Sequence, residues 1–136
     1  MVSFYKDRQK RIIDPLLFSR EAEEMAKNIA EKGKDKGEQK KNKRSQIRKF
    51  YDEVLNLNMR AKSEPWEMVH PLVNMLVAKT AYSFGREYVT EEFLDFIKDA
   101  VNQVSQREDL EVFADFFEAF MGFYRVYGDK HSDKKG

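Results

Sequence analysis

The sequence predicts an all-α protein, a small helical bundle of about five helices. Apolar residues recur mostly at spacings of three and four, which is the period of an amphipathic helix. Glycine and proline are scarce, six and three among 136 residues, so few breaks interrupt the helical pattern. No segment alternates apolar and polar residues as a strand does, and no Asn-Gly pair marks a hairpin.

The length fits a single helical domain over residues 1–136, and a hydrophobic content of 41% is sufficient for a core. Residues 1–14 and 129–136 have the composition of termini that lack fixed structure. No apolar run near the N-terminus resembles a signal peptide, and none reaches the roughly 18 residues of a membrane span. We therefore expect a soluble, cytoplasmic protein without a membrane partner.

Two helices are expected in the first half of the chain. Asp14 and Pro15 form an N-cap and first helical residue, and they open a helix that ends at about residue 31. Residues 32–43 contain glycine, many charges and no periodicity, so we expect a mobile basic loop. The second helix covers about 44–58. Its apolar stripe consists of Ile47, Phe50, Tyr51, Val54 and Leu55.

Three further helices are expected in the second half. The third begins near Pro65 and ends before Gly85, a glycine suited to a left-handed cap. Pro71 inside this segment should either kink the helix or mark its true start. Thr90 caps the fourth helix, and the fifth covers about residues 110–127.

The third and the last of these helices are unusually apolar. Between Leu72 and Phe84 apolar residues occur on nearly all sides, which is expected of a central, buried helix. The last helix carries seven aromatic residues, more than a small bundle readily encloses, so we expect part of its surface to contact another protein. Those residues are Phe113, Phe116, Phe117, Phe120, Phe123, Tyr124 and Tyr127.

The net charge of +1 conceals a strong segregation of charge along the chain. Residues 32–49 contain nine Lys or Arg and two acids, a local balance of +7. Residues 91–118 contain nine acids and two bases, a local balance of −7. A local potential of this size favours a polyanionic partner despite the neutral total, and it also predicts self-association through contact between basic and acidic surfaces.

The basic segment leads directly into the second helix. Arg44 and Arg48 lie about 40° apart on a helical wheel, and Lys41 joins them if the helix extends back that far. Lys43 and Lys49 add charge at the same helix end. Cations beside the free N–H groups of a helix start are suited to phosphate binding, while an ordinary solvated charge run is the alternative interpretation.

Three stretches then show a resemblance to a known family. SQIRKFYDEV, residues 45–54, resembles the helix-opening motif of the small subunit of type III-A (Csm) CRISPR–Cas effector complexes. MLVAKTAYSFGRE, residues 75–87, resembles the family's Lys-x-Ala-Tyr…Gly-Arg segment, and FADFFEAFMGFYRVYG, residues 113–128, resembles its aromatic C-terminal helix. The stretches occur in the expected order and cover residues 43–128, whereas residues 1–40 show no match.

The resemblance implies a helical subunit without catalytic activity, whose copies stack into a filament beside other effector-complex subunits and contact the backbones of the crRNA and the target RNA. It assigns backbone contact to Arg48, Lys79 and Arg86, and leaves Gln46 and Tyr82 with either an RNA-contacting or a structural role. Lys79 lies within an apolar arc of the helix, so its methylene stem covers apolar surface. Its amine then either extends into solvent without a further role or contacts the RNA. The candidate RNA-binding residues are Lys41, Lys43, Arg44, Gln46, Arg48, Lys49, Lys79 and Arg86. Cations suit phosphates rather than base edges, so binding should be largely independent of sequence.

The sequence indicates no catalytic residue, metal or cofactor. The lack of cysteine excludes disulfides, thiol nucleophiles and Cys-based zinc sites. His70 and His131 are too few for a catalytic triad, and Glu67 with His70 has the Glu-x-x-His spacing of a di-iron helix without the required second copy. The alternative function is a helical adaptor that acts only through protein contacts, with the basic run as a solubilising turn.

Overall fold

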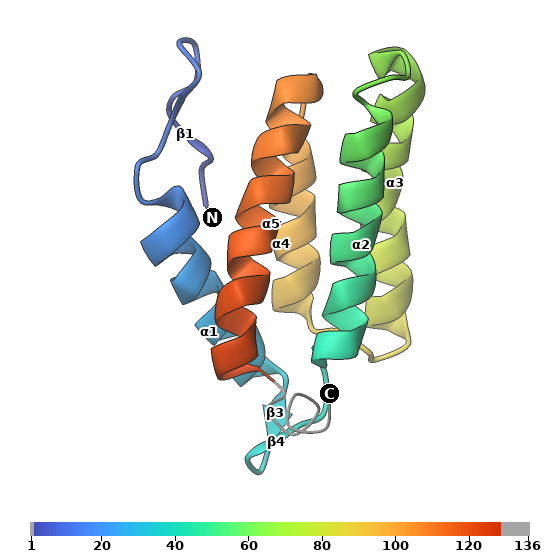
Figure 1. Ribbon diagram of the computed structural model, residues 1–136. Coiled ribbons are helices and arrows are strands. Elements are labelled where there is room, and N and C mark those ends of the chain that lie inside the picture. Colours follow the sequence, from blue (N-terminus) through green and yellow to red (C-terminus); the bar gives the residue numbers. More distant parts are fainter. Residues whose placement is uncertain (1, 129–136) are drawn as a thin grey trace.

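The computed structural model describes residues 2–128, which form a bundle of five α-helices (Figure 1). The helices are α1 (Ala22–Lys32), α2 (Arg44–Arg60), α3 (Trp66–Gly85), α4 (Glu91–Asn102) and α5 (Arg107–Tyr127). Two short antiparallel strand pairs accompany them: β1 (Tyr5–Asp7) with β2 (Ile12–Ile13), and β3 (Lys34–Asp35) with β4 (Glu38–Gln39). The predicted fold class and number of helices are confirmed.

α5 lies at the centre of the bundle, with α1 on one side, α2 on the other and α4 behind it (Figure 1). Phe96 of α4 contacts four rings of α5, with centroid distances of 5.4 to 6.3 Å. Burying one such side chain contributes about 1.5–3 kcal/mol relative to leaving it exposed. The α5 side chains that are completely buried in this aromatic core are Phe113, Phe116, Phe117, Phe120 and Tyr124.

The expected central, buried position of α3 was therefore wrong, whereas the expected contact of part of the α5 surface with another protein stays a prediction. α3 packs against α4 and α2 at the edge of the bundle, and its outer side exposes Met68, Met75 and Tyr82. The rings of α5 fill the protein's own core, because three helices surround it. A helix that is apolar on all sides can be central or can carry an exposed apolar stripe, and its own sequence does not separate the two cases. α3 also runs through Pro71 instead of starting there.

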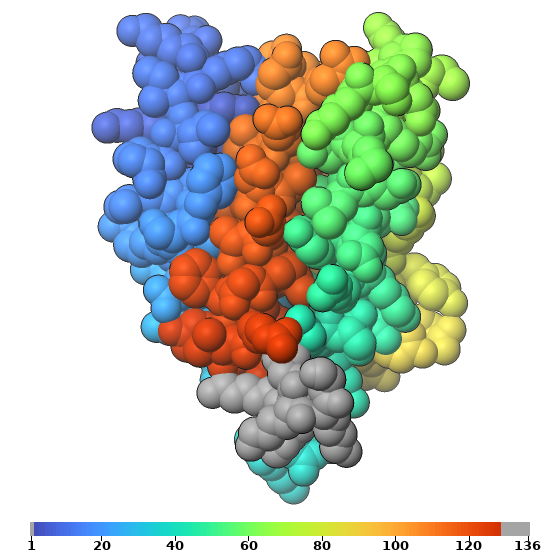
Figure 2. All heavy atoms as spheres, in the orientation of Figure 1, coloured from blue at the N-terminus to red at the C-terminus, as the bar shows by residue number. Residues whose placement is uncertain are grey.

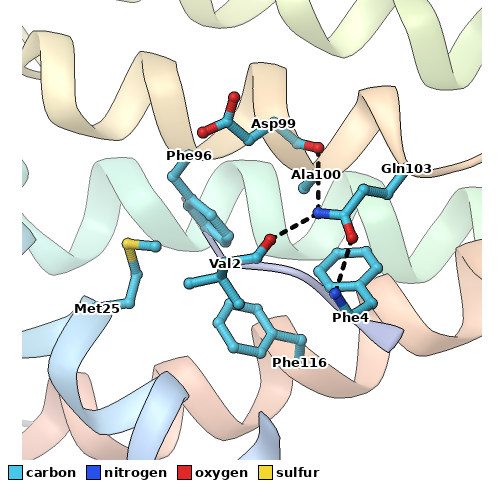
Figure 3. A pocket seen from close by; sticks show the side chains of 8 residues that line it. All are labelled: Val2, Phe4, Met25, Phe96, Asp99, Ala100, Gln103 and Phe116. Atoms are coloured by element: carbon cyan, nitrogen blue, oxygen red, sulfur yellow. Dashed lines mark hydrogen bonds between the residues drawn. The ribbon is translucent and has the colours of Figure 1, made fainter. Parts of the chain in front are cut away.

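The N-terminal residues, expected to lack fixed structure, form a hairpin that packs on the bundle. Phe4 is 1% exposed, and its ring lies 5.9 Å from Phe116 and 6.2 Å from Phe113. The amide of Gln103 holds the backbone on both sides of this ring (Figure 3): its oxygen accepts from Phe4 N at 2.8 Å, and its nitrogen donates to the carbonyl of Val2 at 2.8 Å. The N-terminal segment has no strand pattern of its own, and contacts with residues about 100 positions later in the sequence order it.

The chain then enters α1 through an irregular first turn. The predicted N-cap, Asp14, lies before the helix start: its carboxylate accepts from Leu16 N at 2.9 Å, but Leu16 is the residue that caps the first helical turn. Residues Leu17–Glu21 form a short π-helix, η1, and the α-helix starts only at Ala22. The helix expected at residue 15 is therefore α-helical only in its second part.

The basic loop over 32–43 also contains more structure than expected. β3 and β4 form a hairpin whose turn residues, Lys36 and Gly37, have φ values of 53° and 81°. Gly33 starts this loop at a close contact, because a Cβ there would lie 2.2 Å from the carbonyl oxygen of Lys41. The hairpin, the start of α2 and the end of α3 lie at the same end of the molecule (Figure 1). Among the described residues, no helix combines the length and the apolar character that a bilayer crossing requires.

Candidate nucleic-acid interface

The candidate residues surround the start of α2. Lys43 is the N-cap residue and Arg44 begins the helix, so Lys41 precedes the helix and does not share its face. Lys43, Arg48, Lys49, Lys79 and Arg86 are exposed. Lys41, Arg44 and Gln46 are half-buried.

The structure divides these residues between two sides of α2. Lys49 and Lys79 both line a groove of about 200 Å³ between α2 and α3, together with Phe50, Glu53 and Ser83. Consecutive helical residues point about 100° apart, so Arg48 leaves α2 in a different direction from Lys49. The cations of the helix start were expected to form one surface, and this expectation was wrong.

Arg48 lies on the side of α2 that faces α5. It pairs with Asp52 at 3.8 Å and neighbours Tyr51, whose ring packs 5.4 Å from that of Phe117. Burial and the carboxylate of Glu118 raise the pKa of Tyr51, while the charge of Arg48 lowers it. Arg48 therefore lies within the field of an acidic residue of α5.

That acidic residue belongs to an acidic stripe on α5, formed by Glu111, Asp115 and Glu118 at spacings of four and three. All three are exposed. Burial, then repulsion from Glu111 and Glu118, raises the pKa of Asp115, while Lys62 lowers it. None of the three carboxylates makes an ion pair with the described part of the chain. The field of this stripe disfavours a polyanion beside Arg48, so the groove between α2 and α3 is the better candidate for phosphate contact.

Several candidate cations are paired with carboxylates in the free chain. Lys79 pairs with Glu53 across the groove, and Lys41 pairs with Glu87 at 3.7 Å. Lys49 makes no ion pair with the described part of the chain. Exposed pairs of this kind are worth at most about 1 kcal/mol, so a phosphate can displace the carboxylates at little cost.

Asn42 fixes the position of the basic loop against the bundle. Its side-chain nitrogen donates to the carbonyl of Ile29 at 2.9 Å and to Thr90 Oγ1 at 2.8 Å, and its oxygen accepts from Thr90 N at 2.9 Å. Its backbone N–H donates to the carbonyl of Tyr88 at 3.0 Å, and its own carbonyl accepts from the hydroxyl of Tyr124 at 2.6 Å. Asn42 is completely buried and has a φ of 56°, a left-handed conformation that asparagine tolerates better than most residues. Sequence analysis missed this residue.

The end of α3 presents Arg86 beside two tyrosines. Arg86 donates to the hydroxyls of Tyr82 and Tyr88, at 2.9 and 3.2 Å, and its guanidinium lies over both rings. The helix ends in a Schellman motif, with Tyr88 N bonded to Ser83 O at 3.0 Å. The left-handed residue of this motif is Glu87, with a φ of 65°, so the prediction that Gly85 takes this role was wrong. Tyr88 was not among the predicted site residues.

The imidazole of His70 packs against the bundle. His70 stacks on Trp66, with centroids 4.9 Å apart, and its Nε2 lies 3.1 Å from the carbonyl oxygen of Val104. Within residues 2–128, no three His, Cys, Asp or Glu side chains are grouped so that they could hold a metal. His131 lies outside the described residues.

The sequence matches the family model described as Csm2 Type III-A over residues 19–130. A similar curated protein is the CRISPR system Cms protein Csm2 of Streptococcus thermophilus, 28% identical over 88 residues, which cover 63% of this chain and 73% of that protein. No solved structure gives a significant match. The predicted resemblance is confirmed, and the chain belongs to the Csm2 Type III-A family, the small subunits of type III-A CRISPR effector complexes.

Proposed function

We propose that this protein is a non-catalytic, cytoplasmic subunit that contacts the backbones of crRNA and target RNA through the groove between α2 and α3. The observation that carries the proposal is the position of Lys49 and Lys79 on the two walls of one groove. Cations along a groove follow a phosphate backbone without reading base edges, so affinity depends little on sequence.

Fluorescence anisotropy with two unrelated single-stranded RNAs, across a salt series, tests this proposal. Contact with three or four phosphates gives a slope of about −2 to −3 for log affinity against log salt. The double variant Lys49→Ala/Lys79→Ala should weaken binding to both RNAs and reduce the steepness of the slope by about 1.4. The matched control Lys6→Ala/Lys98→Ala removes two exposed cations remote from the groove and should leave the slope unchanged. Equal slopes for the two double variants would exclude the groove.

Stacking of copies into a filament beside other effector subunits is the second part of the proposal. The acidic stripe of α5 makes no ion pair within residues 2–128 of its own chain, and the basic loop has the opposite charge. A contact between the basic loop of one copy and the acidic stripe of the next would neutralise both. Light scattering should show multimers that dissociate as salt is raised, and multimers insensitive to salt would contradict this contact.

An adaptor role through protein contacts alone is the second candidate function, and the outer side of α3 favours it. The exposed uncharged positions along this side are occupied by Met68, Pro71, Met75, Ala78 and Tyr82, and the exposed cation Lys79 borders them. An exposed apolar stripe of several helical turns is typical of a protein–protein contact. Tight self-association without any RNA binding at low salt would support this role over the first.

A further inference from the structure

Tyr82, Arg86 and Tyr88 form an exposed cluster that the phosphate contacts do not explain. Tyr82 is 65% exposed and Tyr88 is 41% exposed. The guanidinium carbon of Arg86 lies 5.8 Å from the ring centroid of Tyr82 and 5.4 Å from that of Tyr88. Large aromatic side chains are usually buried, so two rings held at the surface around one arginine indicate a binding surface.

The backbone holds this cluster in a defined position. Arg86 and Tyr88 flank the left-handed residue of the Schellman motif, and Tyr82 lies one turn earlier on α3, at a spacing that brings its side chain beside Arg86. The carbonyl of Tyr88 accepts from Asn42, which is completely buried. The rings are therefore arranged before any ligand arrives, which lowers the entropic cost of binding.

The cluster adjoins the proposed phosphate contacts. Lys79 precedes Tyr82 by three residues, so the two side chains neighbour each other on the surface of α3. The amine of Lys41 reaches Glu87, between Arg86 and Tyr88 in the sequence, at 3.7 Å. The segment around residues 82–88 projects at the edge of the molecule close to the start of α2 (yellow in Figure 2). An RNA backbone that follows the groove thus passes beside the rings.

We infer that the cluster of Tyr82, Arg86 and Tyr88 is a stacking site for one unpaired RNA base. This inference rests on the proposed RNA-contacting function and names the part of the RNA that this surface takes. Every base has a π-face, so stacking on a tyrosine or on a guanidinium plane selects no sequence. Arg86 donates to both phenol oxygens, which leaves each phenol hydrogen available to an acceptor on the base or its phosphate. Lys79 and Lys41 place cations beside the rings, so a nucleic acid fits the cluster better than a protein does.

The test compares an ordinary single-stranded RNA with an abasic ribose-phosphate oligomer of the same length, each measured by fluorescence anisotropy. Tyr82→Ala should weaken binding of the ordinary RNA about fivefold or more and leave binding of the abasic oligomer unchanged. Tyr82→Phe keeps the ring and should bind within about twofold of the unsubstituted protein. Met75→Ala shortens a 50% exposed neighbour on the same helix and should have no effect on either ligand. The salt slope should not change in Tyr82→Ala, because no phosphate contact is lost.

Four results would overturn the inference in distinguishable ways. Equal affinity of Tyr82→Ala and the unsubstituted protein for ordinary RNA would remove the stacking site while the groove contacts stand. An equal loss for both ligands would make Tyr82 a phosphate-contacting or structural residue. A loss of self-association with RNA affinity unchanged would make the cluster a protein contact. Failure of the unsubstituted protein to bind either ligand at low salt would refute the proposed function, and the stacking site with it.

Discussion

Replacing Asp109 by asparagine tests how the N-terminal hairpin is fastened to the bundle. Asp109 is completely buried at the start of α5, and one of its carboxylate oxygens accepts from the Tyr5 hydroxyl and from Arg11 Nη1, each at 2.5 Å. The other oxygen accepts from Ser105 N and Oγ at 3.0 Å and from Gln106 N at 3.1 Å. An amide in this place keeps the shape of the side chain but turns an NH₂ group toward donors and removes the charge.

The magnitude follows from the pKa of this carboxyl group. Burial alone would raise the pKa of Asp109, but the hydrogen bonds from Tyr5, Ser105 and Arg11 outweigh burial and lower it from 3.8 to about 2. A folded-state pKa below the unfolded value stabilises the protein above the unfolded pKa, and this stabilisation is lost as the pH falls through the folded pKa. The difference corresponds to about 2 kcal/mol, of which roughly half is lost by pH 3 and most by pH 2.

Urea unfolding at pH 6, 4, 3 and 2 measures this contribution. At pH 6 the free energy of unfolding of the unsubstituted protein should exceed that of Asp109→Asn by at least about 2 kcal/mol. This difference in free energy should become smaller by about the same amount as the pH falls to 2. Other carboxylates titrate in both proteins, so their effects cancel in the difference. The matched control Glu108→Gln changes the preceding residue, which is exposed and makes none of these hydrogen bonds, so at pH 6 its free energy of unfolding should lie close to that of the unsubstituted protein.

A gap between the unsubstituted protein and Asp109→Asn that stays constant from pH 6 to pH 2 would refute the reasoning. In that case Asp109 would have the same pKa in the folded and unfolded states, and its hydrogen bonds to Tyr5 and Arg11 would not hold the hairpin. Hydrogen exchange supplies an independent observation: the amides of β1 should exchange faster in Asp109→Asn, while those of α4 should change less.

Three further predictions concern the other end of the molecule. Asn42→Ala should lower the free energy of unfolding by about 3 kcal/mol, since three side-chain hydrogen bonds of about 1 kcal/mol each are lost. A decrease of less than about 1 kcal/mol in urea unfolding would contradict the contribution assigned to these hydrogen bonds. Glu87→Gly should stabilise the fold by up to about 1 kcal/mol, because glycine takes the positive φ without strain. Glu87→Gln keeps a side chain at the positive φ, so its thermal unfolding should show no increase in stability. Glu53→Gln should raise RNA affinity about two- to fivefold, because it releases Lys79 from its ion pair. The control Asp95→Asn changes an exposed residue of α4 and should leave RNA affinity unchanged. Equal RNA affinities of the two variants in anisotropy titrations would count against the groove.

Sequence periodicity predicts the helices of this protein well because each of them buries one apolar side. α2 was expected at 44–58 and covers 44–60, and the last helix was expected at 110–127 and covers 107–127. The earlier start of α5 comes from a capping box between Gln106 and Asp109, a local signal that apolar spacing alone does not register. The ends of helices are thus less predictable than their existence.

The N-terminal hairpin could not be predicted from local sequence. Its strands have three and two residues, too short for an alternating pattern to be recognised. The residues that order it, Phe4 and Tyr5, are held by Phe113 and Asp109, which follow about 100 residues later. Order in this segment depends on contacts that form only once the bundle exists.

The candidate site was predictable in its cations but not in their surroundings. A helical wheel gives the direction of Arg48 and Lys49 relative to α2, yet it does not show which side faces the acidic stripe of α5 and which faces α3. The pairing of Lys79 with Glu53 and of Lys41 with Glu87 likewise depends on packing between elements. Asn42 and Tyr88 were missed because their importance comes from a hydrogen bond between two loops.

The intramolecular ion pairs have a consequence for the proposed function. Under the proposed function, each phosphate that binds Lys79 or Lys41 must displace a carboxylate, so the net gain per contact is smaller than for a free cation, and we expect one subunit alone to bind RNA weakly. Copies stacked along one RNA convert each later contact into an intramolecular event, and weak contacts then combine into high avidity. A small subunit with partly neutralised cations would therefore bind RNA tightly only within an assembled complex, and an isolated subunit would not be sequestered by unrelated RNA. The RNA affinity of the protein should therefore rise steeply with its assembly along the RNA.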